Sequence, residues 1–397
     1  MKKPIVVFGL GLVLFFLSAV ISYVVFSKVG MSSSSGKGFG NIFNPLQATQ
    51  QVKIQNKTSE EQVDKEPRTE ACPLNGELFS KSQREKWEKR RPLGIMIENH
   101  TQARPQSGLS TADIVFETVA EGGITRFLSV YYCGDASYVG PVRSARIYFI
   151  HLLEGFGQYP LYAHVGGANT PGPADALGYI NKVGWGSYND LNQFAVPFPN
   201  YWRDYERLPN RDTEHTVYTS TSKLWSYASA QRKLTQVDED GKRWDEELTL
   251  PTFAEDAVQS KRGDVKKISF SFWKNLKDDY AVEWKYSTEK NSYTRANGGS
   301  PHIDKNTGKA VESKNIIVIF ADESPANDGY EGGHILYDII GSGKAVVFHN
   351  GQAIKGSWNK KTNESLLTVV DETGEAIEMV RGQQFFEILP IGNTVNY

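Results

Sequence analysis

The chain has 397 residues, a net charge of −2 and 39% hydrophobic residues, which is enough material for two or three domains of ordinary globular composition. The near-neutral charge lacks the basic excess typical of nucleic-acid binding, so we expect no nucleic-acid partner. The sequence also lacks glycine-rich phosphate-binding motifs and metal-ligand spacings, so we expect no cofactor and no metal.

The first predicted element is a membrane span at residues 4–26. This stretch of 23 residues carries no charge and follows two lysines. It is longer than the apolar part of a cleaved signal peptide, which has about 7–15 residues, and it is long enough to cross a bilayer. We therefore expect residues 1–29 to form a cytoplasmic stub and a transmembrane signal anchor. Residues 30–397 would then lie outside the cytoplasm, on a cell-membrane protein with a single pass.

A disordered linker is predicted at residues 30–71, because Ser, Gly, Gln, Lys and Glu dominate there and apolar residues are few. The folded part is predicted to begin at residue 72. Apolar runs in "RPLGIMIENH", "ADIVFETVA", "TRFLSVYYC" and "YAHVGG" predict strands. The stretch "SARIYFIHLLEGF" predicts a helix with Ser144 as its N-cap.

Two domains follow from the order of these elements. Strands and a helix interleave in residues 72–231, which predicts an N-terminal domain of mixed α/β character. Residues 232–262 are strongly charged and are interpreted as a linker. Short strands parted by turn residues predict a mainly β domain at residues 263–397, with hairpins at "HNGQ" and "DETGE". The predicted fold class is therefore α+β, behind one N-terminal transmembrane helix.

The sequence contains two cysteines, Cys72 and Cys133. In an exported protein an isolated pair of cysteines is a candidate disulfide. The alternative is two buried thiols. We expect the disulfide, which would tie the start of the folded part to the end of a strand.

Polar groups follow the first predicted strand of the folded part, in "ENHTQARPQSG". Asn99, Arg104 and Gln106 could present hydrogen-bond donors to a carboxylate, a phosphate or a sugar hydroxyl, because loops after strands commonly carry binding groups. The structural alternative is that Arg104 pairs with a local acid and braces the loop.

Carboxylates come next, in "DIVFETVAEGGITR". Asp113, Glu117 and Glu121 are four residues apart, so on a regular strand they would share one face. Cleavage of a glycosidic bond uses a pair of carboxyl groups, one as the acid and one as the base or nucleophile. The structural alternative is that Glu117 and Glu121 pair with nearby arginines as part of the fold.

Cations and imidazoles complete the candidate site. Arg143, Ser144 and Arg146 lie at the predicted helix start, where free N–H groups and guanidinium groups both attract anions. The alternative is that these arginines neutralise the preceding acids. His164 and His215 are candidate acid–base groups near neutral pH. Their alternative is an ordinary role in a core or loop.

A family resemblance is carried by "RPLGIMIENHTQARPQSGLSTADIVFETVAEGGITRFL", "GPVRSARIYF", "YAHVGG" and "WRD…HTVYTS". These stretches closely resemble the YerB-like family of bacterial surface proteins, and "GSGKAVVFHNGQAIKGSWNK…GQQFFEILP" resembles that family's second domain. The resemblance covers residues 72–397 and implies a two-part extracytoplasmic fold. Members are described as lipoproteins of unknown function, so it implies no reaction and no catalytic residues. This chain departs in having an apolar span instead of a lipid-attachment cysteine, which changes the anchor but not the side of the membrane.

We expect one ligand cleft in the N-terminal domain. The candidate binding residues are Asn99, Arg104, Gln106, Thr125, Arg126, Arg143, Ser144, Arg146, Arg203 and Tyr218. The favoured hypothesis is an envelope protein that binds an anionic polymer or a cell-wall glycan. One alternative is a glycan-cleaving enzyme that uses Glu117 or Glu121 with His164 or His215. The other is a module that binds an envelope protein partner and positions a wall-synthesis enzyme. The sequence leaves the choice between binding and catalysis open.

Overall fold

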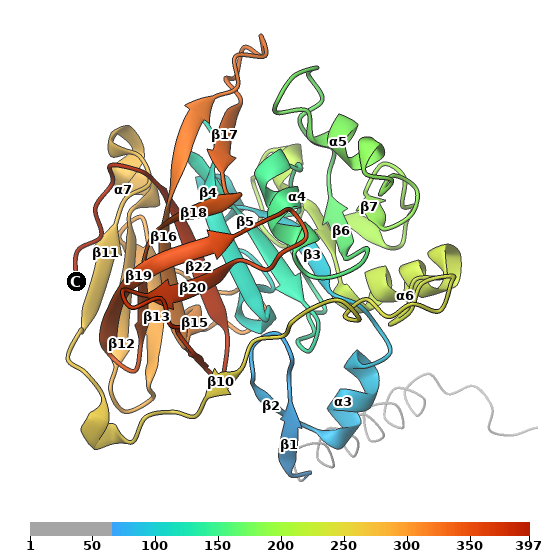
Figure 1. The fold of residues 1–397 in the computed structure, drawn as a ribbon. Helices are drawn as coiled ribbons and strands as arrows, with labels where there is room; N and C mark the ends of the chain where they lie inside the picture. Colours follow the sequence, from blue (N-terminus) through green and yellow to red (C-terminus); the bar gives the residue numbers. More distant parts are fainter. Residues whose placement is uncertain (1–65) are drawn as a thin grey trace, which may run out of the picture. The chain divides into compact units, whose positions relative to one another are not determined.

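Strands from both halves of the chain join in one mixed sheet of 11 strands (Figure 1). The computed structural model describes residues 66–397, which cluster as one compact unit. The sheet has the strand order β20-β19-β18-β16-β22-β4-β5-β3-β6-β7, with β17 paired to β16. Its strands are β3 (Leu93–Glu98), β4 (Ile114–Glu121), β5 (Ile124–Tyr131), β6 (Leu161–His164), β7 (Asp190–Asn192), β16 (Asn315–Pro325), β17 (Ile335–Asp338), β18 (Gly341–His349), β19 (Gln352–Lys360), β20 (Thr368–Asp371) and β22 (Gln384–Pro390).

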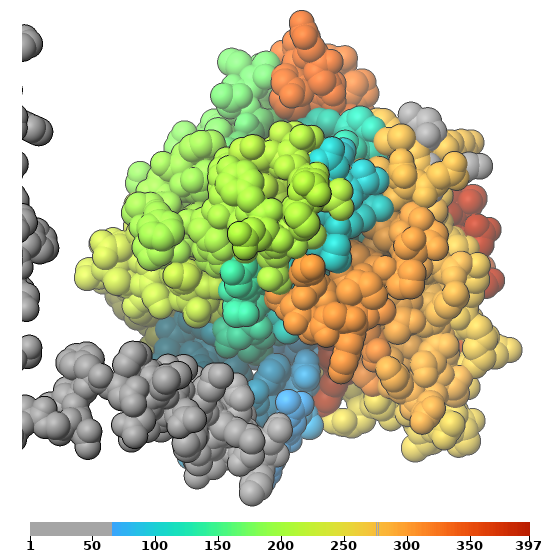
Figure 2. All heavy atoms as spheres, turned by 180° about the vertical axis from the view of Figure 1, so that it is seen from behind, coloured from blue at the N-terminus to red at the C-terminus, as the bar shows by residue number. Residues whose placement is uncertain are grey.

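The last strand, β22, connects the two halves of this sheet. It pairs in parallel with β16 on one side and with β4 on the other. All seven of its residues are buried, which agrees with its apolar sequence QFFEILP. Parallel strands are usually covered on both faces, and a continuous apolar run is typical of such strands. The two halves of the chain therefore share one core, and Figure 2 shows them side by side on the rear face of the molecule.

A smaller antiparallel sheet covers β22 and its neighbours. It contains β11 (Lys267–Phe270), β12 (Val282–Ser287), β13 (Ser292–Asn297), β14 (Ser300–Pro301) and β15 (Glu312–Ser313). Side chains on β12 alternate between buried and partly exposed positions, as in a strand with one face in the core. Its buried Trp284 lies edge-on to Phe385 of β22, with the ring centroids 5.0 Å apart. This contact packs the small sheet against the large one.

The described residues contain few helices, and the fold is mostly β. The helices are α3 (Lys81–Trp87), α4 (Ile147–Glu154), α5 (Ala176–Lys182), α6 (Thr221–Arg232) and α7 (Lys277–Tyr280). The remaining strands form three two-stranded sheets, which are β1 (Arg68–Ala71) with β2 (Leu78–Ser80), β8 (Tyr201–Arg203) with β9 (Val217–Thr219), and β10 (Phe253–Ala254) with β21 (Met379–Val380). The helix predicted after Ser144 is confirmed as α4, but its N-cap is Arg146.

None of the helices within residues 66–397 combines the length and apolarity that crossing a bilayer requires. The predicted span at residues 4–26, and the predicted linker as far as residue 65, lie outside the described residues. Residues 68–71 were assigned to that linker, and this assignment is wrong because they form β1.

The charged segment at residues 232–262 is well packed at its centre. Trp244 is only 1% exposed, and its ring centroid lies 4.9 Å from that of Tyr132 at the end of the central strand β5. The density of charge in "DEDGKRWDEE" indicated a surface excursion, but the tryptophan within it fixes the segment to the core. The apolar residue therefore decides the local structure there, and the charges lie around it.

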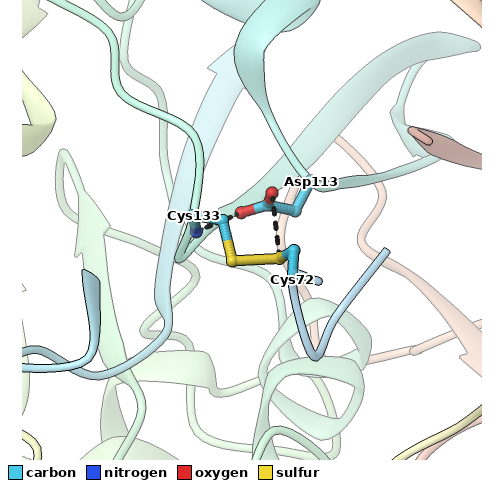
Figure 3. Close-up of side chains that lie close together, drawn as sticks. All are labelled: Cys72, Asp113 and Cys133. Carbon is cyan, nitrogen blue, oxygen red and sulfur yellow. Dashed lines mark hydrogen bonds between the residues drawn. A yellow bond between two sulfur atoms is a disulfide. The ribbon is translucent and has the colours of Figure 1, made fainter. Parts of the chain in front are cut away.

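The predicted disulfide is confirmed (Figure 3). Cys72 and Cys133 are bonded, with their Cα atoms 6.0 Å apart. The buried carboxylate of Asp113 lies beside the bond and accepts the backbone N–H groups of Tyr132 and Cys133 at 2.6 and 2.9 Å. Burial raises the pKa of Asp113 to about 6, although these hydrogen bonds act in the opposite direction. Because the two sulfur atoms are bonded to each other, this cluster is a structural anchor and not a metal site.

Candidate functional site

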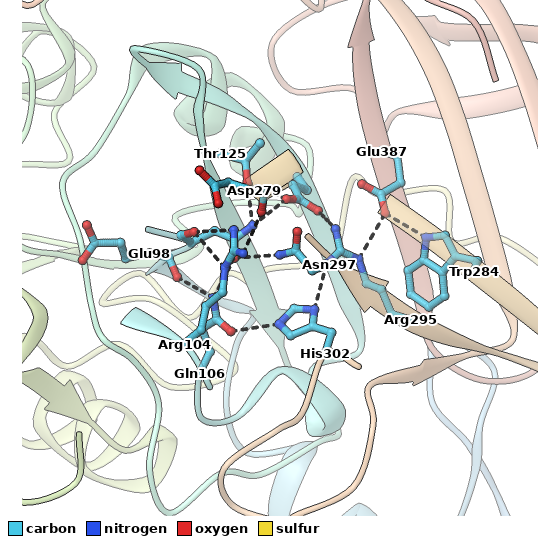
Figure 4. A network of polar contacts seen from close by, with 12 residues as sticks. Glu98, Arg104, Gln106, Thr125, Asp279, Trp284, Arg295, Asn297, His302 and Glu387 are labelled. Atoms are coloured by element: carbon cyan, nitrogen blue, oxygen red, sulfur yellow. Dashed lines mark hydrogen bonds and ion pairs between the residues drawn. The ribbon is translucent and has the colours of Figure 1, made fainter. Parts of the chain in front are cut away.

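The predicted site residues fall into separate groups and do not line one cleft. Asn99, Arg104, Gln106, Glu117 and Thr125 belong to a buried network that also contains residues of the C-terminal half (Figure 4). Glu121, Arg126, Arg143, Ser144, Arg146 and His215 lie together in a second group. His164 is bonded to Asp190, while Arg203 and Tyr218 lie on β8 and β9.

A β-bulge separates Glu117 from Glu121. The register between β4 and β5 shifts between Val119 and Glu121, because β4 has one extra residue there. Glu117 contacts Thr125, whereas Glu121 contacts Arg126. Thr125 and Arg126 are successive residues of one strand, so their side chains point to opposite faces of the sheet. The expectation that Glu117 and Glu121 share a face is therefore wrong.

Glu117 is at the centre of the buried network and is 0% exposed. Its carboxylate accepts hydrogen bonds from Asn99 Nδ2 at 3.0 Å and from Thr125 Oγ1 at 2.6 Å. It also forms an ion pair with the buried guanidinium of Arg295, on β13 of the small sheet. The buried negative charge is thus fully engaged, as a structural carboxylate requires.

Glu387 lies opposite Glu117 on the neighbouring strand β22. Its Oε1 accepts a hydrogen bond from Trp284 Nε1 at 2.9 Å and lies 3.5 Å from Arg295 Nε. Burial raises the pKa of Glu387 well above its ordinary value, and the charge of Glu117 raises it further. One arginine therefore lies beside two carboxyl groups, and their surroundings favour the protonated form of Glu387.

Amide groups extend the network across the two halves. Asn99 Oδ1 accepts hydrogen bonds from Gln106 Nε2 at 2.8 Å, from Arg104 Nε at 3.0 Å and from Asn297 Nδ2 at 3.0 Å. His302 Nε2 lies 2.8 Å from Gln106 Oε1. The polar residues that follow β3 thus contact the C-terminal half of the chain. Arg104 braces the loop, as the structural alternative held, but it does so through the amide and carbonyl of Asn99 and not through a local acid.

The second group contains three arginines that we call the arginine cluster, namely Arg126, Arg143 and Arg146. Arg126 and Arg146 are each 7% exposed and share the carboxylate of Glu121, with Arg126 Nη2 at 3.0 Å from Oε2. Arg126 also donates to the carbonyl of Ser144 at 3.2 Å. Arg143 Nε lies 3.2 Å from Oε1 of Glu98, and the Arg143 side chain is 26% exposed.

Burial and neighbouring charges act on the pKa values of this cluster. Burial lowers the pKa of Arg126 to about 10, and the nearby charges of Arg146 and Arg143 lower it further. Burial alone would raise the pKa of Glu121, but Arg126 and Arg146 hold it below its ordinary value. Arg126 Nε is buried and has no hydrogen-bond partner among residues 66–397. The cluster therefore retains a buried hydrogen-bond donor without a partner, while Arg143 Nη2 also lies 3.9 Å from the carboxylate of Glu214.

Histidines border the arginine cluster on the side of Glu98. His215 Nδ1 lies 2.8 Å from Glu98 Oε2, and the ring of His100 is stacked on that of His215 with the centroids 4.8 Å apart. Sequence reasoning did not select Glu98 or His100. Glu98 ends the apolar run of β3, and this position was the available signal. Its carboxylate holds Arg143 and His215 in place together.

His164 lies apart from these histidines and is fully buried at the end of β6. Its Nε2 is 2.7 Å from Asp190 Oδ1, and its Nδ1 is 2.7 Å from the carbonyl of Gly166. Both nitrogens are therefore engaged. The four side chains considered for glycan cleavage thus each have protein partners, and Glu121, whose pKa is lowered, is poorly suited to donate a proton.

Two further candidates have local roles. Arg203 Nη1 donates to the carbonyl of Thr213 at 2.5 Å and to Thr216 Oγ1 at 3.1 Å. Tyr218 is fully buried, and burial raises the pKa of its hydroxyl. These contacts stabilise the β8–β9 region and bring neither side chain into the arginine cluster by a hydrogen bond.

Comparison with known proteins agrees with the fold. Residues 79–235 match "Protein of unknown function (DUF3048) N-terminal domain", and residues 269–386 match the corresponding C-terminal domain. "Putative lipoprotein YerB" of Bacillus subtilis (strain 168) is 31% identical over 342 residues, which cover 83% of this chain and 90% of that protein. The crystal structure of YerB from Bacillus subtilis is similar with a TM-score of 0.65 and 28% identity, over 83% of this chain and 100% of that chain.

Proposed function

Because this chain belongs to the YerB-like family with paired DUF3048 domains, we propose that it is an extracytoplasmic envelope protein that binds anionic groups of an envelope polymer. The binding site that we propose is the arginine cluster. The family is described as one of unknown function, so the proposal rests on the physical chemistry of this site.

Three observations support a location outside the cytoplasm. The disulfide between Cys72 and Cys133 suits an oxidising compartment. The relative from Bacillus subtilis is described as a lipoprotein, and residues 4–26 of this chain are long and apolar enough to act as an anchor. We therefore propose a single-pass anchor at residues 4–26, with residues 30–397 outside the cytoplasm.

The proposed location is tested with a fusion of residues 1–40 to a reporter protein. The reporter should be found outside the cell and in the membrane fraction, because an uncleaved span retains it. A fusion that begins at residue 30 is the matched control, and its reporter should stay in the cytoplasm. Recovery of a soluble product trimmed after residue 26 would contradict the anchor.

A buried guanidinium nitrogen without a partner is the observation that carries the binding proposal. The three arginines face three carboxylates, those of Glu98, Glu121 and Glu214, yet the buried Arg126 Nε has no hydrogen-bond partner within residues 66–397. Guanidinium groups bind phosphate and carboxylate in a bidentate manner. The arginine cluster also surrounds the start of α4, and the N-terminus of a helix favours anions.

Arg143 is the arginine that a ligand would contact first. Its side chain is more exposed than those of Arg126 and Arg146, so it can contact a polymer without unfolding the loop. The other two arginines hold Glu121 and supply the positive field behind it. We propose that a phosphodiester or carboxylate group of the polymer bonds to Arg143 and draws on that field.

The experiment compares two arginine variants for binding to poly(glycerol phosphate) by isothermal titration calorimetry. Arg143→Ala should weaken binding by about 1.5–3 kcal/mol, which is typical of a charge-assisted hydrogen bond, and should leave the melting temperature nearly unchanged. Arg243→Ala removes the same charge from an exposed pair with Asp245 and should leave binding unchanged. Equal affinity of both variants and the unmodified protein would refute the site.

A further inference from the structure

A polar cavity lies where α4 ends, and it shares no residue with the arginine cluster. Its volume is about 370 Å³, within the range of roughly 300–1,000 Å³ that small-molecule sites occupy. It is bounded by α4, α5, the turn at residues 157–159, the segment at residues 244–248 and the loop that holds Glu364. Among the residues that line it, three are glutamates and none is a lysine or an arginine.

Glu154 is the unusual residue of this cavity. It is 8% exposed, and its Oε1 accepts a hydrogen bond from the Tyr179 hydroxyl at 2.9 Å. That hydroxyl in turn accepts a hydrogen bond from Asn363 Nδ2 at 2.6 Å, so its own proton is directed to Glu154. The other oxygen, Oε2, is buried without a partner among residues 66–397.

The fold gives no reason for a carboxylate at this position. Glu154 is the last residue of α4, where the negative end of the helix dipole disfavours an anion. A buried acceptor without a hydrogen bond also costs stability. Burial raises the pKa of Glu154 to about 7, and the charge of Glu364 adds to this effect. Perturbed carboxyl groups in a cavity are a common sign of a binding site.

The neighbouring charged groups do not satisfy Glu154. The ammonium of Lys360 donates to the carbonyls of Asn363 and Ser365 at 2.7 and 2.6 Å, and within residues 66–397 Glu154 has no ion-pair partner. Glu247 is paired with Lys242 at 2.7 Å and is largely exposed. Burial lowers the pKa of His151 to about 4, so that imidazole is neutral at pH 7.

Aromatic side chains complete the lining. Tyr159, Tyr179 and Trp185 come from the turn after α4, from α5 and from the segment that follows α5. The faces of tyrosine and tryptophan rings attract cations, and the attraction strengthens where water is excluded. Their apolar surfaces also suit an alkyl chain. The aromatic rings together with the unpartnered Oε2 of Glu154 therefore suit a cation that has both N–H donors and an aliphatic chain.

We propose that this cavity binds a primary ammonium group on an alkyl chain, with Glu154 Oε2 accepting its hydrogen bond and Tyr159, Tyr179 and Trp185 surrounding the chain. A primary ammonium supplies the donor that Oε2 lacks, and a quaternary ammonium does not. The site is independent of the proposed anion site, because the two share no residue.

The test uses the full-length chain in non-ionic detergent micelles, with ¹⁵N in the tryptophan indoles and n-butylammonium as the probe. The Trp185 signal, assigned with Trp185→Phe, should shift and saturate. The uncharged analogue n-butanol should give no such shift, and butyltrimethylammonium should bind at least about tenfold more weakly because it has no N–H group. An absent shift, or an equal response to either analogue, would overturn the proposal.

Two matched glutamate variants identify the group that binds. Glu154→Gln should weaken binding by about 10–100-fold, since it removes the charge and keeps the size of the side chain. Glu247→Gln changes an exposed glutamate of the same cavity and should change the dissociation constant by less than about threefold. If Glu154→Gln does not fold, Tyr159→Leu replaces it and should weaken binding several-fold. Affinity unchanged by Glu154→Gln, or by Tyr159→Leu in its place, would overturn the assignment.

Discussion

Glu387 and Glu117 face each other on neighbouring parallel strands, with Arg295 as their shared cation. The pKa of Glu387 is raised in the folded protein, whereas the unfolded chain releases this proton near an ordinary value of about 4.3. The folded state therefore binds a proton that the unfolded state has lost. The stability that this group contributes is full below about pH 4 and falls as the pH rises towards the folded pKa.

The variant Glu387→Gln tests this arrangement, because an amide has a similar shape and cannot ionise. Above about pH 4 the unmodified protein should lose stability as the pH rises, whereas the variant should not. The difference between their free energies of unfolding should therefore grow by about 1.4 kcal/mol for each pH unit until the folded pKa is reached. Urea denaturation between pH 4 and 8 measures the difference. The control Glu117→Gln removes the charge that raises the pKa of Glu387, so Glu387 can ionise beside Arg295 and the dependence of stability on pH should become smaller. Parallel pH profiles for Glu387→Gln and the unmodified protein would contradict the prediction.

At the scale of elements, the β4–β5 hairpin carries Glu121 and Arg126 and turns through Gly122 and Gly123. Both glycines have positive φ angles, +58° and +82°, which an L side chain rarely adopts. A Cβ at Gly123 would lie 2.6 Å from Leu276 Cδ1 and 2.9 Å from Trp273 Cε3, whereas one at Gly122 would meet nothing within 4 Å. Only the second glycine is therefore required by packing as well as by the backbone.

Matched alanine variants separate these two causes. Gly122→Ala should lower the free energy of unfolding by about 1–2 kcal/mol, because a residue with a Cβ is strained in a left-handed conformation. Gly123→Ala should cost a further 1–3 kcal/mol or so, because Trp273 and Leu276 must move. Thermal unfolding measures both. Equal melting temperatures for the two variants would show that the contact with Trp273 and Leu276 does not constrain the turn.

At the scale of the whole molecule, β22 makes the N-terminal half depend on the end of the chain. Without β22, β4 has an unpaired edge, and without β13, Glu117 loses Arg295 and Asn99 loses Asn297. A fragment of residues 66–262 should therefore fail to fold alone, because an exposed apolar strand edge promotes aggregation. Addition of a fragment of residues 263–397 should restore a dispersed amide NMR spectrum.

A nicked protein provides the control for this experiment. A protease site inserted at the exposed turn between Asp240 and Gly241 should allow cleavage without loss of structure, since the two pieces share one core. If residues 66–262 alone unfolded cooperatively on heating, the halves would be independent folding units and the dependence on β22 would be refuted.

Local patterns in the sequence predicted much of this architecture. Apolar runs located the strands on both sides of Gly122, and the expectation of export together with two cysteines predicted the disulfide. The family motifs predicted that the folded region has two parts. These features depend on neighbouring residues, where period and composition are informative.

Long-range pairing explains what could not be predicted. Arg295 and Glu387 complete the network around Glu117, and no local pattern in the sequence links them. One extra residue in β4 turned Glu121 to the opposite face, and a bulge has no reliable sequence signal. The arginine cluster was recognised by its residue types, but its separation from the buried amides depended on this bulge.

The disulfide also determines how the protein responds to a mechanical pull. Tension applied to the chain before Glu66 can straighten β1 only as far as Cys72, from where the sulfur–sulfur bond passes the force to Cys133 at the end of β5. The sequence between the two cysteines, which are 61 residues apart, carries none of that load. Unravelled, this stretch would add on the order of 200 Å of length. The bond therefore gives the folded part a fixed point of attachment and directs the force into the central sheet.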